Sequence, residues 1–186
     1  MKKITIAFVV VALFVCVASV RSQEAPKNSF HGYVEPEVDS TGTARVKAFV
    51  TYGGKTKLGA YCWGQTSEGY SQVYCGPTYS FSKGVQVGVA VGAETVKNSL
   101  RKAGFIWTGK GRFANLLVVE SGGSGHWYRN QASYQASKAV SLSITSQRFS
   151  GTGPRVDVTL PKTSLSVGGE YHFATQTSRF GVRYSF

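Results

Sequence analysis

The chain has 186 residues, enough for one domain, and only 16% of them are charged, whereas about a quarter is usual in soluble domains. Its 22 glycines and 13% aromatic residues favour many short strands and tight turns over helices. The net charge is +12, but the basic residues are spread along the chain and form no basic stripe, so nucleic acid is excluded as a partner.

The N-terminus predicts export from the cytoplasm. Lys2 and Lys3 precede an apolar run over residues 4–17, which small residues follow. We therefore expect a cleaved signal peptide over residues 1–22, with cleavage after Ser19 as the alternative, and a periplasmic N-terminal tail over residues 23–29. In an exported protein, lipopolysaccharide or an anionic solute is the expected partner of the positive charge.

From residue 30 onward, apolar and polar residues alternate between turn signals, which predicts strands and no helix. The clearest alternation runs over residues 85–92, where every second residue is valine. The expected strands are residues 30–38, 44–52, 55–65, 70–81, 85–92, 102–108, 112–120, 127–134, 140–149, 155–160, 165–174 and 179–186. We expect the connections on the side away from the termini to be longer on average.

The last strand carries the most specific motif. Phe180, Val182, Tyr184 and Phe186 alternate with small or polar residues, and Phe186 ends the chain. This pattern resembles the closing strand of bacterial outer-membrane β-barrels. The resemblance implies a Gram-negative outer-membrane protein, in which these four residues are the signal that the barrel-assembly machinery recognises.

The polar faces of the expected strands favour a barrel over a soluble sandwich. Positions opposite the apolar ones hold residues such as Arg45, Lys47 and Glu170, which suit a wet lumen better than a dry core. We therefore predict an all-β fold over residues 30–186: a single-chain antiparallel transmembrane β-barrel of about 12 strands, with 8 or 10 as alternatives. Its last strand is expected to pair with the strand near Phe30.

Two cysteines remain after signal cleavage. If Glu68 and Gly69 form a hairpin loop, Cys62 lies directly opposite Cys75, where a disulfide fits in register. Two packed free thiols are the alternative.

The expected lumen has more basic than acidic side chains. The basic residues assigned to it are Arg45, Lys47, Lys57, Lys102, Arg112, Arg129, Arg155 and Arg183. The acidic residues assigned to it are Glu35, Glu37, Glu120, Asp157 and Glu170. A basic excess favours anions in an open pore. The alternative is an Arg/Glu network that fills a narrow barrel.

Aromatic residues are expected at two kinds of position. Tyr61, Trp63 and Tyr74 are assigned to the lumen. The residues assigned to the girdles at the membrane interfaces are Trp107, Trp127, Tyr128, Tyr171 and Tyr184.

The sequence favours a porin-like channel for passive diffusion of small, preferentially anionic solutes. The alternatives are a structural or adhesive barrel with a closed lumen and, third, a lipid-modifying enzyme. Glu120, Ser124 and His126 lie near one loop but match no catalytic motif, so we expect no enzyme activity. The histidines lack zinc-site spacing, and we expect no cofactor or metal. Outer-membrane lipid, lipopolysaccharide and the assembly machinery are the expected partners.

Overall fold

The computed structural model describes residues 29–53, 56–96 and 99–186. The expected signal peptide and most of the expected tail lie outside the described residues. The strands are β1 (Ser29–Asp39), β2 (Ala44–Gly53), β3 (Leu58–Ser67), β4 (Tyr70–Ser82), β5 (Val85–Glu94), β6 (Leu100–Lys110), β7 (Phe113–Gly122), β8 (Gly125–Gln135), β9 (Val140–Gln147), β10 (Gly151–Thr159), β11 (Leu165–His172) and β12 (Thr177–Ser185). The described part of the chain contains no helix of the length and hydrophobicity needed to cross a membrane.

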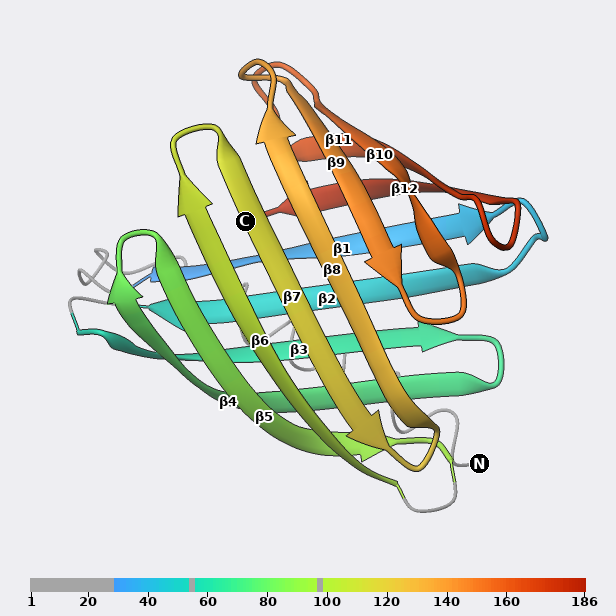
Figure 1. Ribbon diagram of the computed structural model, residues 1–186, viewed down its shortest axis with the longest axis horizontal. Helices are drawn as coiled ribbons and strands as arrows, with labels where there is room; N and C mark the ends of the chain where they lie inside the picture. Colours follow the sequence, from blue (N-terminus) through green and yellow to red (C-terminus); the bar gives the residue numbers. More distant parts are fainter. Residues whose placement is uncertain (1–28, 54–55, 97–98) are drawn as a thin grey trace.

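Each strand pairs antiparallel with its sequence neighbours, and β1 pairs with β12, so the sheet closes into one barrel (Figure 1). The predicted fold class, with twelve strands, is confirmed. At the closing seam, Val38 lies opposite Phe180 and Val34 opposite Tyr184. The backbone of Phe186 exchanges two hydrogen bonds of 3.0 Å with that of Gly32, which extends the seam to the last residue.

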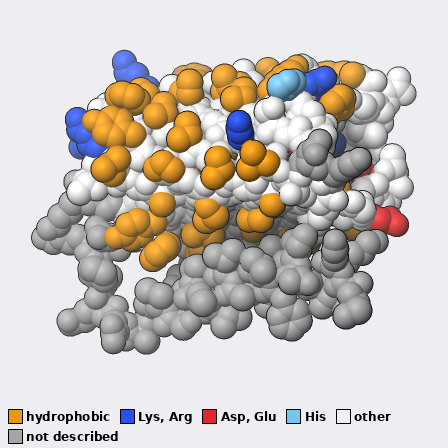
Figure 2. Space-filling model, turned by 90° about the horizontal axis from the view of Figure 1, so that it is seen from below, with side chains coloured by type: hydrophobic (Ala, Val, Ile, Leu, Met, Phe, Trp, Pro, Cys, Tyr) orange, Lys and Arg blue, Asp and Glu red, His pale blue; other side chains and the backbone are white. Residues whose placement is uncertain are grey.

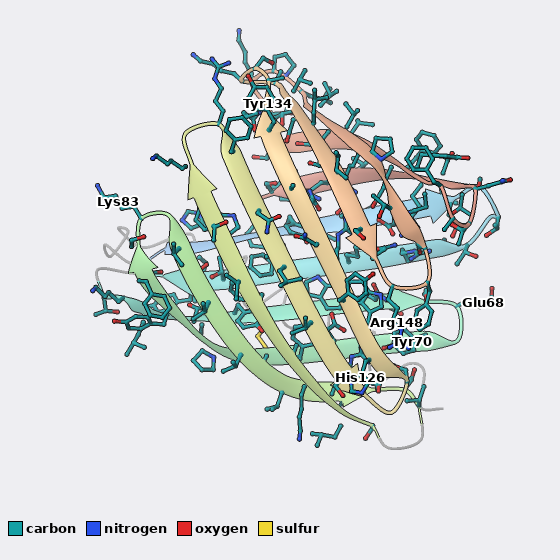
Figure 3. All side chains as sticks on the ribbon, viewed as in Figure 1. Glu68, Tyr70, Lys83, His126, Tyr134 and Arg148 are labelled. Carbon is teal, nitrogen blue, oxygen red and sulfur yellow. A yellow bond between two sulfur atoms is a disulfide. The ribbon has the colours of Figure 1, made fainter. Side chains whose placement is uncertain are left out.

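The connections between strands are short at both ends of the barrel. At the end where β1 begins and β12 ends, which we call the end of the termini, they are residues 54–57, 83–84, 111–112, 136–139 and 160–164. At the opposite end they are residues 40–43, 68–69, 95–99, 123–124, 148–150 and 173–176. Figure 3 shows Glu68, His126 and Arg148 toward this second end, and Lys83 and Tyr134 toward the first. The expectation of longer connections on the side away from the termini is wrong, because several predicted loop residues extend the strands instead.

Prolines within the strands coincide with breaks in the backbone pairing. The β4–β5 ladder passes from Cys75–Val91 to Thr78–Gly88 with no pair between them, and Pro77 lies in this gap. The β1–β12 ladder has a similar gap at Pro36, between Val34–Tyr184 and Glu37–Gly181. Proline has no N–H to donate, so each gap is the local result of the residue itself.

The outside of the barrel is apolar. Val89, Val91 and Phe180 are among the residues that expose 60% or more of their surface there, and apolar side chains spread over the face seen in Figure 2. Aromatic pairs lie near the end of the termini, for example Phe30 with Tyr52 and Phe113 with Tyr134. A closed barrel with an apolar exterior and aromatic residues near its rim is the form of a membrane-spanning β protein.

A disulfide joins Cys62 and Cys75 on the outer face of β3 and β4 (Figure 3). It closes a loop with a sequence separation of 13 residues, so it restricts the unfolded chain.

Replacing both cysteines by serine is expected to lower the free energy of unfolding by about 2–3 kcal/mol, the loss that loop-closure entropy predicts for a loop of this size. Urea unfolding in detergent micelles measures this loss. Wild-type protein that is reduced while unfolded and then refolded is the control and should match the double variant. Equal midpoints for the oxidised wild type and the variant would contradict the prediction.

Candidate functional site: the barrel lumen

The lumen has an aromatic wall formed by β2, β3, β4 and β6. Tyr61 lies at its centre, with ring centroids 4.8 Å from Phe105 and 6.2 Å from Tyr74. Trp63 stacks on Tyr74 at 5.3 Å, and Phe49 packs against the same cluster. Tyr61 and Tyr74 are buried, so aromatic rings line this side of the lumen.

Gly88 explains how Phe105 fits into this wall. The two residues lie opposite each other on β5 and β6, and the Phe105 ring occupies the space that a side chain on residue 88 would need. The glycine therefore sets the position of the ring within the lumen.

The opposite wall is charged and is built by β1, β2 and β8–β12. Glu35 lies at its centre: it accepts hydrogen bonds from Arg155 at 2.6 Å and from Arg183 at 2.9 Å. Arg155 also pairs with Asp157 at 2.6 Å, and the guanidinium of Arg183 lies 4.5 Å from the centre of the Tyr33 ring. These contacts join β1, β10 and β12 through side chains.

Further ion pairs extend this charged wall in both directions around the barrel. Glu37 contacts Lys47 at 2.6 Å and Arg45 at 3.0 Å, so β1 and β2 are joined. Glu170 lies 3.5 Å from both Arg129 and Arg155, and so connects β8, β10 and β11. The network spans several strands and fixes long side chains that would otherwise be mobile.

A second network lies at the end of the lumen away from the termini. Arg101 pairs with Glu120 at 2.6 Å and with Glu94 at 3.1 Å. Ser124, in the β7–β8 turn, donates to Glu94 from both its backbone N–H, at 2.9 Å, and its hydroxyl, at 2.6 Å. Tyr70 donates to Glu94 at 2.8 Å. These bonds hold the tip of the β7–β8 hairpin against the lumen wall.

In several ion pairs the cation is more exposed than the carboxylate it contacts. The exposed fractions are 29% for Arg183 against 3% for Glu35, and 15% for Arg129 against 0% for Glu170. Arg45 is 17% exposed, against 2% for Glu37. Arg155 and Asp157 form the exception, at 4% and 14%. The accessible surface of the charged wall is therefore mainly basic, with the acidic groups beneath it.

Five of the eight basic residues assigned to the lumen lie on inward-facing strand positions: Arg45, Lys47, Arg129, Arg155 and Arg183. The other three assignments are wrong. Lys57 precedes β3 and Arg112 lies in the β6–β7 turn, and both are exposed. Lys102 lies opposite the exposed Val91 on the outer face.

The sequence interpretation missed four charged residues of the lumen: Asp39, Glu94, Arg101 and Arg179. With them included, the basic side chains on inward strand positions are Arg45, Lys47, Arg101, Arg129, Arg155, Arg179 and Arg183. The acidic ones are Glu35, Glu37, Asp39, Glu94, Glu120, Asp157 and Glu170. The two sets are equal in number, so the expected basic excess is wrong for the described strands, and any anion preference depends on which charges are accessible.

Some of the positions predicted for aromatic residues are correct and others are wrong. Tyr61, Trp63 and Tyr74 face the lumen, and Tyr128, Tyr171 and Tyr184 face outward. Trp107 and Trp127 share the lumen parity of Phe105 and Glu120, so their girdle assignment is wrong.

Glu120, Ser124 and His126 do not form a catalytic triad. Glu120 is held by Arg101 and Tyr74, and Ser124 by Glu94 and Arg101. His126 is exposed on the outer-face parity of β8, away from both. Within the described ranges, no group of three or more His, Cys, Asp or Glu residues is placed to hold a metal ion.

Comparison with solved structures relates this barrel to porins. The KdgM porin superposes with a TM-score of 0.57 at 12% identity, covering 84% of this chain and 99% of its own. Its structure in complex with disordered oligogalacturonate gives 0.57 at 11% identity with the same coverage. The NanC porin gives 0.54 at 11% identity, covering 82% of this chain and 98% of its own. No family model and no curated protein matches the sequence.

At these identities the likeness concerns the fold: a closed β-barrel of the outer-membrane porin type. The chain thus folds as a closed barrel of twelve antiparallel strands that is similar in fold to these porins.

Proposed function

We propose that this protein is a porin-like channel of the bacterial outer membrane, through which small solutes diffuse passively, and that it has no enzyme activity. The apolar exterior, the closed twelve-stranded barrel and the likeness to the KdgM and NanC porins support this proposal. Both termini belong to the periplasmic side, as in other barrels with an even number of strands. Export by a signal peptide over residues 1–22, with residues 23–29 as a tail, completes this proposal.

We further propose a preference for anionic solutes. The observation that carries it is the layering of charge in the lumen, where Arg183, Arg45 and Arg129 are each more exposed than their carboxylate partners. A permeating ion interacts most strongly with the charges it meets directly, because the buried carboxylates are farther away and already paired. The KdgM porin in complex with oligogalacturonate makes small anionic solutes a fitting class.

Three lumen substitutions test the anion preference together: Arg45→Gln, Arg129→Gln and Arg183→Gln. The reversal potential in planar bilayers under a salt gradient measures the anion-to-cation permeability ratio. We expect a ratio above one for the wild type and a fall of about threefold or more in the triple variant, because each accessible charge changes local ion concentrations.

The matched control removes three cations outside the lumen: Lys57→Gln, Lys102→Gln and Arg112→Gln. It should leave the ratio unchanged. Channel events with a cation preference in the wild type would contradict the charge argument alone. Complete absence of channel events from refolded protein would contradict the porin proposal.

A structural or adhesive barrel with a closed lumen is the second candidate. The full burial of His172 and Thr145 favours it, because side chains fill the lumen at their positions. The short connections away from the termini offer little adhesive surface. A barrel that inserts in bilayers without conducting would support this candidate.

A further inference from the structure

The rim at the end of the termini is basic. Every charged side chain that the structure describes in the connections of this end is a cation: Lys57, Lys83, Arg112, Lys138 and Lys162. Lys110, the last residue of β6, adds another at the same level. The rim is therefore suited to an anionic partner.

One part of this rim has a shallow, open groove. Lys110, Gly111, Arg112, Phe113 and Tyr134 line a hollow of about 630 Å³ on the outside of the barrel. Lys110 lies opposite Phe113, and Phe113 opposite Tyr134, so all three side chains have the same outward parity on β6, β7 and β8. Their position faces the membrane and not the lumen.

The groove combines two unpaired cations with exposed aromatic surface. In the described part of the chain, the side chains of Lys110 and Arg112 have no hydrogen-bonding or ion-pairing partner. The Phe113 and Tyr134 rings lie 4.9 Å apart, and Phe113 exposes 66% of its surface. A ligand that pairs with the two cations and also packs on the aromatic rings has an anionic head next to an apolar chain.

We propose that this groove binds the headgroup of an anionic glycerophospholipid of the phosphatidylglycerol type, in the membrane leaflet on the side of the termini. The Lys110 ammonium and the Arg112 guanidinium donate hydrogen bonds to the phosphodiester oxygens. The first part of an acyl chain packs on Phe113 and Tyr134, at the depth where interfacial aromatic residues lie. Lys110 extends along the outer wall toward the phosphates, as long basic side chains do at membrane interfaces.

A lipid fits these observations better than a soluble acidic polymer. A polymer in the periplasm would meet the water-facing cations of the turns, whereas Lys110, Phe113 and Tyr134 face the bilayer. The leaflet in which the lipid binds depends on the orientation of the barrel proposed above. Binding of the lipid to the groove does not depend on whether the barrel conducts.

Native mass spectrometry of the refolded full-length protein in detergent tests the proposal. The probes are phosphatidylglycerol and phosphatidylcholine with identical acyl chains, so only the headgroup charge differs. We expect the wild type to prefer phosphatidylglycerol severalfold. The double variant Lys110→Gln/Arg112→Gln should lose this preference and bind phosphatidylglycerol severalfold more weakly, because each cation near an anionic headgroup contributes to affinity, while phosphatidylcholine binding stays the same.

The control Lys83→Gln/Lys138→Gln removes the same charge from two other turns and should leave the preference intact. An equal loss in this control would overturn the proposal, since general rim charge and not the groove would then attract the lipid. Displacement of the lipid by millimolar inorganic phosphate would also overturn it, in favour of a free-phosphate site. A gel-mobility shift between heated and unheated samples establishes that each variant is folded, and equal lipid binding in wild type and folded double variant would refute the assignment.

Discussion

Replacing Glu35 by glutamine is expected to lower the free energy of unfolding of the barrel by about 3 kcal/mol, the lower end of the range for breaking a buried ion pair. Glu35 is 2% exposed and bonds to both Arg155 and Arg183. Glutamine keeps the size of the side chain but leaves Arg183 without a carboxylate within salt-bridge distance among the described residues.

The position of Glu35 in the barrel increases this expected effect. It lies on β1 at the closing seam, beside Pro36, where the β1–β12 ladder has its gap. The contact from Glu35 to Arg183 on β12 crosses that gap and replaces backbone hydrogen bonds that the seam lacks. Losing it weakens the site where the two ends of the sheet meet.

Urea unfolding in micelles measures the loss, with Glu68→Gln as the matched control because Glu68 is an exposed turn residue. The double variant Glu35→Gln/Arg183→Gln should be less destabilised than the sum of the two single variants, since the pair is then removed as a unit. A loss below about 0.5 kcal/mol, typical of exposed ion pairs, would show that the seam does not depend on Glu35.

Deletion of Phe186 is expected to reduce the amount of assembled protein in the outer membrane about tenfold or more, while secretion into the periplasm continues. The C-terminal motif Phe180, Val182, Tyr184 and Phe186 is the proposed signal for the assembly machinery. The structure adds a second reason, because the two backbone hydrogen bonds between Phe186 and Gly32 close the end of the seam.

Two measurements separate these reasons. Heat-modifiability of membrane fractions reports assembly in cells, and refolding of the purified variant into micelles reports intrinsic stability. Phe186→Tyr keeps an aromatic terminus and both backbone bonds, so it should assemble normally. Wild-type levels of the deletion variant in the outer membrane would refute the assembly signal.

The sequence predicted strand faces well where one face is uniformly apolar. The valines over residues 85–92 and the aromatic positions of the last strand point outward as expected. The interpretation failed on β6, because Trp107 was assigned to the interface girdle and Lys102 to the lumen. Trp107 shares the lumen parity of Phe105, so Lys102 faces outward and Arg101 faces the lumen. Where aromatic residues line the lumen, the usual alternation of polar inward and apolar outward residues is reversed. The sequence of a single strand does not show which of the two arrangements applies.

The sequence also could not predict which charged side chains of the lumen are accessible and which are buried beneath them. Glu35 lies 120 residues from Arg155 and 148 from Arg183, so no local spacing joins them. Which partner of a pair is accessible depends on how three or four strands pack their side chains together. The clustering of cations in the turns of one end, by contrast, is visible in the sequence once the strands are assigned.

The disulfide of the β3–β4 hairpin has a consequence for the order of events during biogenesis. It faces outward, so in the proposed membrane barrel it lies on the lipid side, away from soluble thiol reagents. On the proposed export route, oxidation therefore precedes insertion, in the periplasm, where disulfides form. The β3–β4 hairpin is then already held in register by a covalent bond when the chain reaches the membrane. The loop-closure entropy of this hairpin has been lost before the remaining strands pair with it.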